Sequence, residues 1–419
     1  MNRTQTVKLR AMVWYGDTEI DINFPESWDV HVCAMKGQNA PVLTDAGIRE
    51  AFARPIGTKS IRELACGKKE VVIVFDDMSR PTPVSVIVPY VLEELAQAGI
   101  PDDNIRFVGA PGGHGTMNRI DFAKKLGDDI AGRFLVFNHN PYENCTYLGK
   151  TSRGTPVSVN SEVMACDLKI GIGCIVPHPL NGFGGGGKII LPGVSSLETI
   201  HINHSTFAPS PLCGIGRCDN NPFKQDIDET AKMAGLDVKI DAILNLKREI
   251  TALFVGDPAL EHAEGVKVAR EHFATEFISD ADIVIANCYS KANEVILAPL
   301  IAAPSLKKEG GDMVIISVTP EGQIPMYWTR SWGKAMGGQG WYPRKGLPPN
   351  TKRLTIMSPY PDKAGVDCIA PYELVGWAET WDEVICRLEE TYGDSARVAV
   401  IPDVTVQYFP EVEAGKPVG

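Results

Sequence analysis

Residues 71–83 have the sequence VVIVFDDMSRPTP. A short, continuously apolar run that ends in two aspartates is typical of a buried parallel strand. Apolar residues then recur at helical spacing up to Gly99, and a second apolar run at 105–110 leads into the turn Pro-Gly-Gly-His. This strand–helix–strand order predicts an α/β architecture.

Further along the chain, LKIGIGCIV at 168–176 is predicted to be another buried strand, and residues 259–273 an amphipathic helix. From about 177 to 225 the sequence is rich in Gly, Pro, Asn and Ser, and we expect a long irregular segment there. The α/β rhythm restarts near residue 277. We therefore predict two α/β domains with the active site in the cleft between them, 1–275 and 277–400, with the tail 403–419 returning to the first.

Composition excludes several classes of protein. The chain has 419 residues, 44% of them hydrophobic, and a formal charge of −11. These values are typical of globular proteins and argue against a general nucleic-acid binder, which needs a basic surface. No apolar run is long enough to span a membrane, and the first residues lack a signal peptide's apolar core, so we expect a cytoplasmic protein without membrane partners. The ten cysteines include no CxxC pair, which disfavours a zinc or iron–sulfur site.

Three histidines stand out by their positions. His114 and His178 each follow a predicted strand, at the edge where open α/β sheets bind ligands, and His204 closes IHINHS. A single histidine is more often structural than catalytic, but two at strand ends favour a site. The other histidines keep a structural interpretation; we expect His262 and His272 on the polar side of a helix.

The glycine-rich loop GFGGGGK, 182–188, resembles a phosphate-binding P-loop but lacks the Ser or Thr that must follow its lysine. It also lacks the spacing of a dinucleotide fingerprint. What remains is a backbone at Gly184, Gly185 and Gly186 that can approach a ligand closely, ending in Lys188. That lysine could contact phosphate, carry a proton or anchor a group covalently. A solvated surface loop is the alternative.

The segment after the first strand offers further site residues. Arg80 suits bidentate binding of a carboxylate or phosphate, and Asp77 can orient Arg80 or a histidine. Ser79 and Asp77 could equally cap the following helix. A hydrolase that uses Lys188 with Asp77 finds little support, because no nucleophile elbow or triad spacing is visible.

Together these segments resemble the nickel-dependent lactate racemase family. The resemblance lies in VFDDMSRPTP, GGHGTM, LGKTSRGTPVSVN, IVPHPLNGFGGGGKIILPGVSSLETI and INHS. It implies a nickel-pincer nucleotide, a pyridinium mononucleotide with two sulfur-containing arms, attached covalently at Lys188 and made by separate cofactor-synthesis enzymes. His204 matches the protein's nickel ligand, and His114 and His178 match the paired acid/base histidines.

The resemblance also assigns the remaining site residues. Asp77 and Arg80 match residues that line the substrate site, and the glycine loop, with Ser79 and Arg80, would hold the cofactor and its phosphate. The reaction implied is inversion at C2 of a 2-hydroxy acid, by hydride transfer to the cofactor and return to the other face. A base on each face requires two histidines.

Two departures from the family concern the substrate. Leu297 and Leu300 stand where lactate-specific members place Gln and Lys, with Lys291 just upstream as another cation, and Gly187 replaces an arginine of the loop. Aromatic residues and an arginine gather later in the chain: Tyr327, Trp328, Trp332, Trp341, Tyr342 and Arg344. They favour a 2-hydroxy acid bulkier than lactate, unless they pack in the second domain's own core. An aldonate C2 epimerase and a non-catalytic protein that binds a hydroxy acid or nucleotide are the alternatives.

Overall fold

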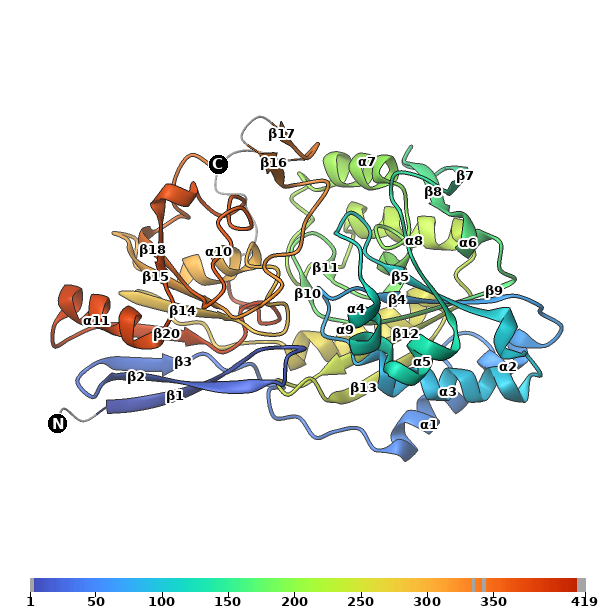
Figure 1. Ribbon diagram of the computed structural model, residues 1–419, viewed down its shortest axis with the longest axis horizontal. Helices are drawn as coiled ribbons and strands as arrows, with labels where there is room; N and C mark the ends of the chain where they lie inside the picture. The colour runs from blue at the N-terminus through green and yellow to red at the C-terminus, as the bar shows by residue number, and fades with distance from the viewer. Residues whose placement is uncertain (1–3, 334–335, 341–343, 413–419) are drawn as a thin grey trace. The chain divides into compact units, whose positions relative to one another are not determined.

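The computed structural model describes residues 4–333, 336–340 and 344–412 (Figure 1). The chain divides into two compact units. We call Gly37–His272 the inserted unit, and Met1–Lys36 together with Phe273–Gly419 the outer unit. The division near Phe273 lies close to the restart expected at 277. The amino-terminal segment differs from the prediction, because it belongs with the carboxyl-terminal part of the chain.

A six-stranded sheet forms the centre of the inserted unit. Its strands run parallel except for the antiparallel pair at one edge. The expected strands at 71–76, 105–110 and 168–174 are all present and fully or largely buried. The strand order is β13 (Ile250–Gly256), β12 (Val238–Leu244), β9 (Leu168–Cys174), β4 (Val71–Asp76), β5 (Ile105–Ala110), β6 (Leu135–Asn138).

Helices and short strand pairs surround this sheet, and most helices begin at a side-chain cap. Asn221 caps α8, Pro222 occupies its first turn, and Gly235 ends it in the left-handed conformation with φ 69°. The remaining elements are α1 (Asp45–Ala53), α2 (Ile61–Ala65), α3 (Val84–Gln97), η1 (Asp102–Asn104), α4 (Arg119–Leu126), α5 (Asp128–Arg133), β7 (Cys145–Lys150), β8 (Pro156–Asn160), α6 (Ser161–Met164), β10 (Pro177–His178), β11 (Gly182–Phe183), η2 (Gly186–Ile189), α7 (Leu197–Phe207), α8 (Pro222–Ala234) and α9 (Pro258–His272).

Two expectations for this unit are wrong. The stretch 177–225 is not irregular throughout, since Ser196 caps the eleven-residue helix α7 within it. His262 and His272 do not lie on a polar surface of α9, because both are buried. Each imidazole donates a hydrogen bond from Nε2 to a backbone carbonyl oxygen, which satisfies a polar group inside the protein.

The outer unit has its own six-stranded sheet, in which every strand pair is parallel. The first of its strands in sequence, β3, pairs with the last, β20. The order is β19 (Val375–Ala378), β18 (Thr351–Met357), β15 (Gly311–Ser317), β14 (Ile283–Cys288), β20 (Arg397–Ile401), β3 (Asp29–Val32). The other elements are β1 (Thr4–Ala11), β2 (Thr18–Pro25), α10 (Leu297–Ala302), η3 (Ala303–Ser305), β16 (Ser331–Gly333), β17 (Met336–Gly337), η4 (Tyr372–Leu374) and α11 (Trp381–Tyr392).

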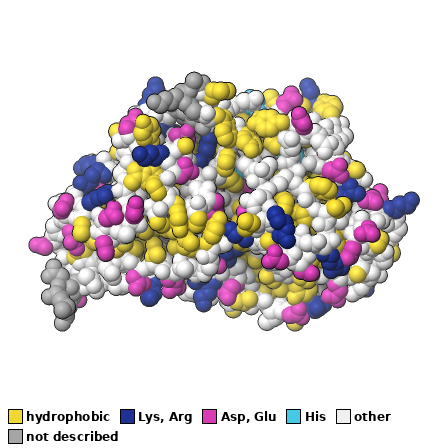
Figure 2. Space-filling view, in the orientation of Figure 1, with side chains coloured by type: hydrophobic (Ala, Val, Ile, Leu, Met, Phe, Trp, Pro, Cys, Tyr) yellow, Lys and Arg dark blue, Asp and Glu magenta, His cyan; other side chains and the backbone are white. Residues whose placement is uncertain are grey.

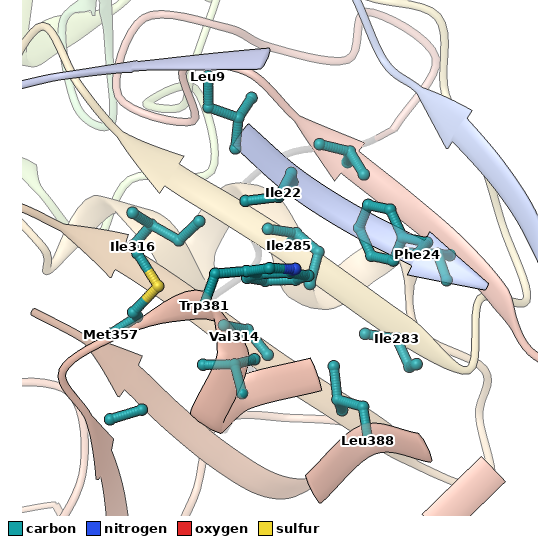
Figure 3. Close-up of a cluster of buried hydrophobic side chains, with 14 of the residues drawn as sticks. Leu9, Ile22, Phe24, Ile283, Ile285, Val314, Ile316, Met357, Trp381 and Leu388 are labelled. Carbon is teal, nitrogen blue, oxygen red and sulfur yellow. The ribbon is translucent and has the colours of Figure 1, made fainter. Parts of the chain in front are cut away.

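The core of the outer unit lies between its sheet and the layer formed by α11 with the β1–β2 hairpin (Figure 3). Alternate residues of β14 and β15, such as Ile283 and Ile285, point into this core. Trp381 packs edge-on against Phe24 of β2, with ring centroids 5.2 Å apart. The hairpin therefore supplies one side of a core that the carboxyl-terminal part of the chain could not complete without it.

Charged side chains of both signs are interspersed on the face shown in Figure 2. Among the described residues, no helix combines the length and the apolar character that a membrane crossing requires.

Candidate active site

The candidate site lies in the inserted unit, at the carboxyl ends of β4 and β9. From β4 the chain proceeds through β5 and β6 on one side of the sheet and then returns to β9 on the other. Ligands of open α/β sheets bind where the strand order reverses in this way. A pocket is found at this place; it is lined by Asp76, Asp77, Arg80, Ala110, Pro111, His114, Gly173, Cys174, Gly184, Gly185, Lys188, Ile189, Pro192, Gly193 and Lys239.

A buried carboxylate orients His114 in this pocket. Oδ2 of Asp77 lies 2.7 Å from Nδ1 of His114, and Oδ1 accepts hydrogen bonds from the backbone and side chain of Ser79. Burial raises the pKa of Asp77, but the charges and hydrogen bonds of His114, Arg80 and Ser79 outweigh it and lower that pKa to about 2. A carboxylate on Nδ1 fixes the imidazole tautomer whose lone pair is on Nε2, as a general base requires.

Arg80 is held at the same turn. Its Nη1 donates to the backbone oxygen and the hydroxyl of Ser79 at 2.9 and 2.8 Å. Beneath the turn, the fully buried Lys125 donates to Asp76 at 2.6 Å and to the backbone oxygen of Arg80 at 2.8 Å. A buried ion pair that also bonds the main chain restricts the conformation of this loop, so Asp77, Ser79 and Arg80 are presented on a fixed backbone.

His178 has the opposite hydrogen-bonding pattern. Its Nδ1 accepts backbone N–H groups from Leu180 and Asn181, at 3.2 and 3.1 Å. An imidazole that accepts at Nδ1 carries its proton on Nε2 when neutral, so Nε2 of His178 can donate a hydrogen bond. His114 is among the residues that line the pocket and His178 is not.

The glycine loop is held from below by two side chains. Oδ2 of Asp241 accepts from the backbone N of Gly186 at 2.6 Å, and Nε2 of His262 lies 2.8 Å from the carbonyl oxygen of Gly184. Gly185 has φ +88°, and an added Cβ would lie 2.5 Å from Oδ2 of Asp241. Glycine is required there both by conformation and by space.

Lys188 and His204 meet at one aromatic ring. Nζ of Lys188 lies 5.7 Å from the ring centroid of Phe223, and the His204 ring packs edge-on against the same ring at 4.8 Å. Nδ1 of His204 lies 2.9 Å from the carbonyl oxygen of Ile200, which places the lone pair on Nε2. Burial and then the Lys188 ammonium lower the pKa of His204 to about 3, so the imidazole is neutral at pH 7.

These features fit a metal that is bound mainly by an organic cofactor. A neutral imidazole whose other nitrogen bonds a carbonyl is the usual state of a metal-ligating histidine. Among the described residues no three His, Cys, Asp or Glu side chains gather as a metal site. The chain thus offers one imidazole, His204, beside one lysine, Lys188, and further ligands would come from the cofactor.

Sequence reasoning missed several residues that build this pocket. Lys239 lines it and forms an ion pair with Asp241, and both are buried. Neither lies in a recognisable motif; only the alternation of charged with apolar residues in VKIDAIL could have drawn attention to them. The neighbouring Glu261 is fully buried as well, and burial, followed by the charge of Asp241, raises its pKa well above the ordinary value.

Gly187 is enclosed by α8. An added Cβ would lie 3.0 Å from Cβ of Ala231 and 3.1 Å from the carbonyl oxygen of Ile227. An arginine at this position would therefore require α8 to move away from η2. Glycine at position 187 thus allows the close packing of η2 against α8.

The residues expected to bind substrate from the second domain lie in the outer unit. Leu297 and Leu300 are both on α10, buried and exposed respectively. Lys291 is buried in an ion pair with Glu294 at 3.1 Å, so its charge is already balanced. Arg344 is exposed, and its Nε donates to the backbone oxygen of Cys368. Trp341 and Tyr342 lie outside the described residues.

Of the described aromatic residues, Tyr327 and Trp332 pack on each other with centroids 5.3 Å apart. Trp332 is 47% exposed, and neither ring belongs to the core cluster of the unit. Tyr327 and Trp332 are therefore not explained as members of this core cluster.

Comparison with known proteins identifies relatives of this chain. Residues 15–216 match the family model described as the lactate racemase N-terminal domain. The chain is 29% identical to lactate racemase of Thermoanaerobacterium thermosaccharolyticum over 342 residues, covering 78% of this chain and 76% of the relative. It is 28% identical to lactate racemase of Lactiplantibacillus plantarum over 390 residues, with 85% and 88% covered.

The fold is also shared with solved structures. The lactate racemase apoprotein from T. thermosaccharolyticum superposes with a TM-score of 0.71 at 21% identity, covering 97% of this chain and all of that one. A crystal structure from Thermotoga maritima gives a TM-score of 0.61 at 16% identity, with 83% and 97% covered.

In sequence the chain is similar to lactate racemases, which are isomerases, and it shares their α/β fold. The resemblance to the lactate racemase family predicted from the sequence is confirmed, since residues 15–216 match the model of the lactate racemase N-terminal domain.

Proposed function

We propose that the protein racemises or epimerises the C2 carbinol of a 2-hydroxy acid with a nickel-pincer nucleotide, attached at Lys188. Similarity to two lactate racemases supports the reaction class. The observation that carries the proposal is the pairing of Asp77 with His114 in a pocket that also contains Arg80 and Lys188. It combines an oriented base, an anion-binding group and an anchoring lysine.

The cofactor would be held by residues that differ in kind. Lys188 would form the covalent link, Nε2 of His204 would complete the nickel coordination, and the backbone of Gly184, Gly185 and Gly186 would adjoin the nucleotide. Ser79 and Arg80 would contribute at the opposite side of the pocket. When bound, the cofactor supplies a hydride acceptor for the carbinol carbon, which the side chains of this chain cannot provide.

The protein's own residues manage binding and the hydroxyl proton. Arg80 would pair with the substrate carboxylate, because a buried anion without a cationic partner is costly. Nε2 of His114 would take the proton of the C2 hydroxyl. The Asp77 carboxylate would stabilise the imidazolium that forms, since it stays ionised down to a pKa of about 2.

His178 would serve the other face of C2. It would enter this step as the imidazolium, return a proton to the hydroxyl oxygen and be left as the neutral imidazole, while the proton that His114 took would pass to solvent. The base of one direction is then the acid of the other, so each histidine would change its protonation state during inversion.

We further propose a substrate bulkier than lactate. Leu297 and Leu300 cannot bind a carboxylate, and the Lys291 charge is used by Glu294. The partly exposed Tyr327 and Trp332 offer a surface for an apolar side chain or for a sugar acid. To test this, the enzyme that carries its cofactor (the loaded enzyme) is incubated with a panel of D-2-hydroxy acids and aldonates, and the products are separated by chiral chromatography. Fast turnover of lactate and none of the larger acids would contradict it, and turnover of aldonates alone would identify a C2 epimerase.

The cofactor assignment is tested by intact mass. Chain produced together with the cofactor-synthesis enzymes should exceed the mass of its sequence, and Lys188→Ala should abolish the increase. Lys169→Ala is the matched control, because Lys169 is also buried in the inserted unit but donates to the backbone oxygen of Cys166. An increase that survives Lys188→Ala would refute the attachment site.

Nickel content and turnover complete the test. His204→Ala should keep the mass increase and lose nickel. Loaded wild-type protein that interconverts none of the hydroxy acids would favour the non-catalytic binding protein over the isomerase.

A further inference from the structure

Arg330, in the outer unit, is buried, and no described carboxylate forms an ion pair with it. Its side chain is 4% exposed, and its Nη1 donates to the backbone oxygen of Gly365 at 2.7 Å. Nε and Nη2 are buried with no hydrogen-bond partner, and among the residues that the structure describes no carboxylate forms an ion pair with this guanidinium. Burying an uncompensated charge is among the most costly arrangements in a protein interior.

The two unpartnered nitrogens form one edge of the guanidinium. Nε and Nη2 point the same way and together match the two oxygens of a carboxylate. Arg353 of the same unit shows the match: its Nε and Nη2 donate to the carboxylate of Asp312 at 3.0 and 2.6 Å. Arg330 thus has the donor geometry that Arg353 uses, with its third nitrogen fixed by the main chain.

The position of Arg330 also favours a ligand. Arg330 belongs to the connection that leaves the carboxyl end of β15, and Gly365, which anchors it, belongs to the connection that leaves the carboxyl end of the neighbouring parallel strand β18. Ligands of open α/β sheets bind along this edge. The turn that accepts from Arg330 at Gly365 accepts from the exposed Arg344 at Cys368, which adds a second cation to the same turn.

We propose that Arg330 is a carboxylate-binding residue of the outer unit, which takes the acid group of a small 2-hydroxy acid through its Nε and Nη2 atoms. The acid is either the substrate, whose carboxylate would then bind Arg330 in place of Arg80, or a separate ligand. Only its assignment as substrate rests on the proposed function.

Binding is tested on the full chain without cofactor. At least one of D-mandelate, D-malate and D-gluconate should raise the melting temperature of the wild type, whereas the neutral amide of that acid should not. Arg330→Lys keeps the charge but loses the two-pronged edge, and should weaken the affinity at least tenfold in calorimetric titration. Arg353→Lys, the matched control, should bind as the wild type does.

The site can also be mapped without any variant. The same acid should slow backbone hydrogen exchange of residues 326–332 and 364–368 in the wild type. Failure of all three acids to bind, equal binding by Arg330→Lys, or protection confined to other segments would overturn the proposal.

Turnover separates the two sources of the acid. If the acid is the substrate, Arg330→Lys should raise the KM of loaded enzyme tenfold or more while kcat changes by less than threefold. If it is a separate ligand, KM should stay unchanged although binding to the cofactor-free chain is lost. Because binding is measured without cofactor, a loaded enzyme that racemises nothing would refute the proposed function and leave the Arg330 site standing.

Discussion

Asp77 and His114 are joined by a 2.7 Å contact between Oδ2 and Nδ1, and the carboxylate in this pair is buried. The same carboxylate bonds Ser79, which in turn accepts from Arg80. The base and the anion-binding group of the pocket therefore share one support, and a change to Asp77 affects both.

Asp77→Asn should reduce turnover of loaded enzyme by about three to four orders of magnitude, because an amide can hold the wrong imidazole tautomer and cannot stabilise the imidazolium. The intact-mass increase and the nickel content should stay at wild-type levels. A variant that retains more than a tenth of wild-type activity would show that the carboxylate does not orient a catalytic histidine.

The two histidines should differ in tautomer in the cofactor-free protein. Nitrogen-15 NMR at pH 8 should find the ring proton of His114 on Nδ1 and that of His178 on Nε2, as their partners require. Asp77→Asn should disturb the first assignment and leave the second intact. Identical tautomers in the wild type would remove the structural basis for one acid and one base.

Removal of the Lys188 charge should raise the pKa of His204. The ammonium of Lys188 is the largest contribution after burial to the low pKa, which is about 3. NMR titration of cofactor-free Lys188→Met should show this rise. His139, whose pKa burial lowers to about 4, provides the internal reference and should titrate as before.

Gly185→Ala should destabilise the chain, whereas Gly184→Ala should not. Gly185 has a positive φ and Asp241 within 2.5 Å of an added Cβ, while the nearest atom to a Cβ at Gly184 is 3.6 Å away. The expected loss of unfolding free energy for Gly185→Ala is about 1–3 kcal/mol. Urea denaturation measures both variants, and equal midpoints would mean that the loop adapts freely.

The contribution of buried histidines to stability should fall as the pH is lowered from about 6.5 to 4. Burial lowers the pKa of His139 and of His262 to about 4, so in this window the unfolded chain binds protons that the folded chain does not. Each buried histidine contributes a slope of about 1.4 kcal/mol per pH unit. His139→Gln should reduce the slope of the unfolding free energy against pH by the contribution of one histidine, about 1.4 kcal/mol per pH unit. An unchanged slope would contradict this account.

Strands β4, β5 and β9 were predictable from the sequence, because continuous apolar runs such as 71–75 have few other uses in a globular chain. The candidate site followed from residues that end those strands, such as Asp77 and His114. Helix α7 was missed because glycine, proline and asparagine on both sides conceal its own short pattern. The burial of His262 was missed because helical spacing alone does not tell which face of α9 meets the loop.

Other features depend on contacts between distant parts of the chain. Nothing local in residues 29–32 indicates that they pair with 397–400. Nothing in the sequence around Arg330 distinguishes it from other arginines, and the sequence analysis considered Arg344 and Lys291 instead. Arg330 stands out only in the structure, where its Nε and Nη2 have no hydrogen-bond partner among the described residues. Side-chain pairing across a fold is set by tertiary packing, which periodicity does not report.

The pairing of β3 with β20 has a consequence for synthesis of the chain. The β1–β2 hairpin and β3 leave the ribosome first, yet the strand beside β3 is made some 370 residues later. The inserted unit can fold during that interval, because all strands of its sheet lie between the two. The amino-terminal segment must wait, with the apolar side of its hairpin uncovered, until translation is nearly complete. Truncated chains would thus keep the apolar face of the β1–β2 hairpin exposed, and exposed apolar surface is what chaperones and proteases recognise.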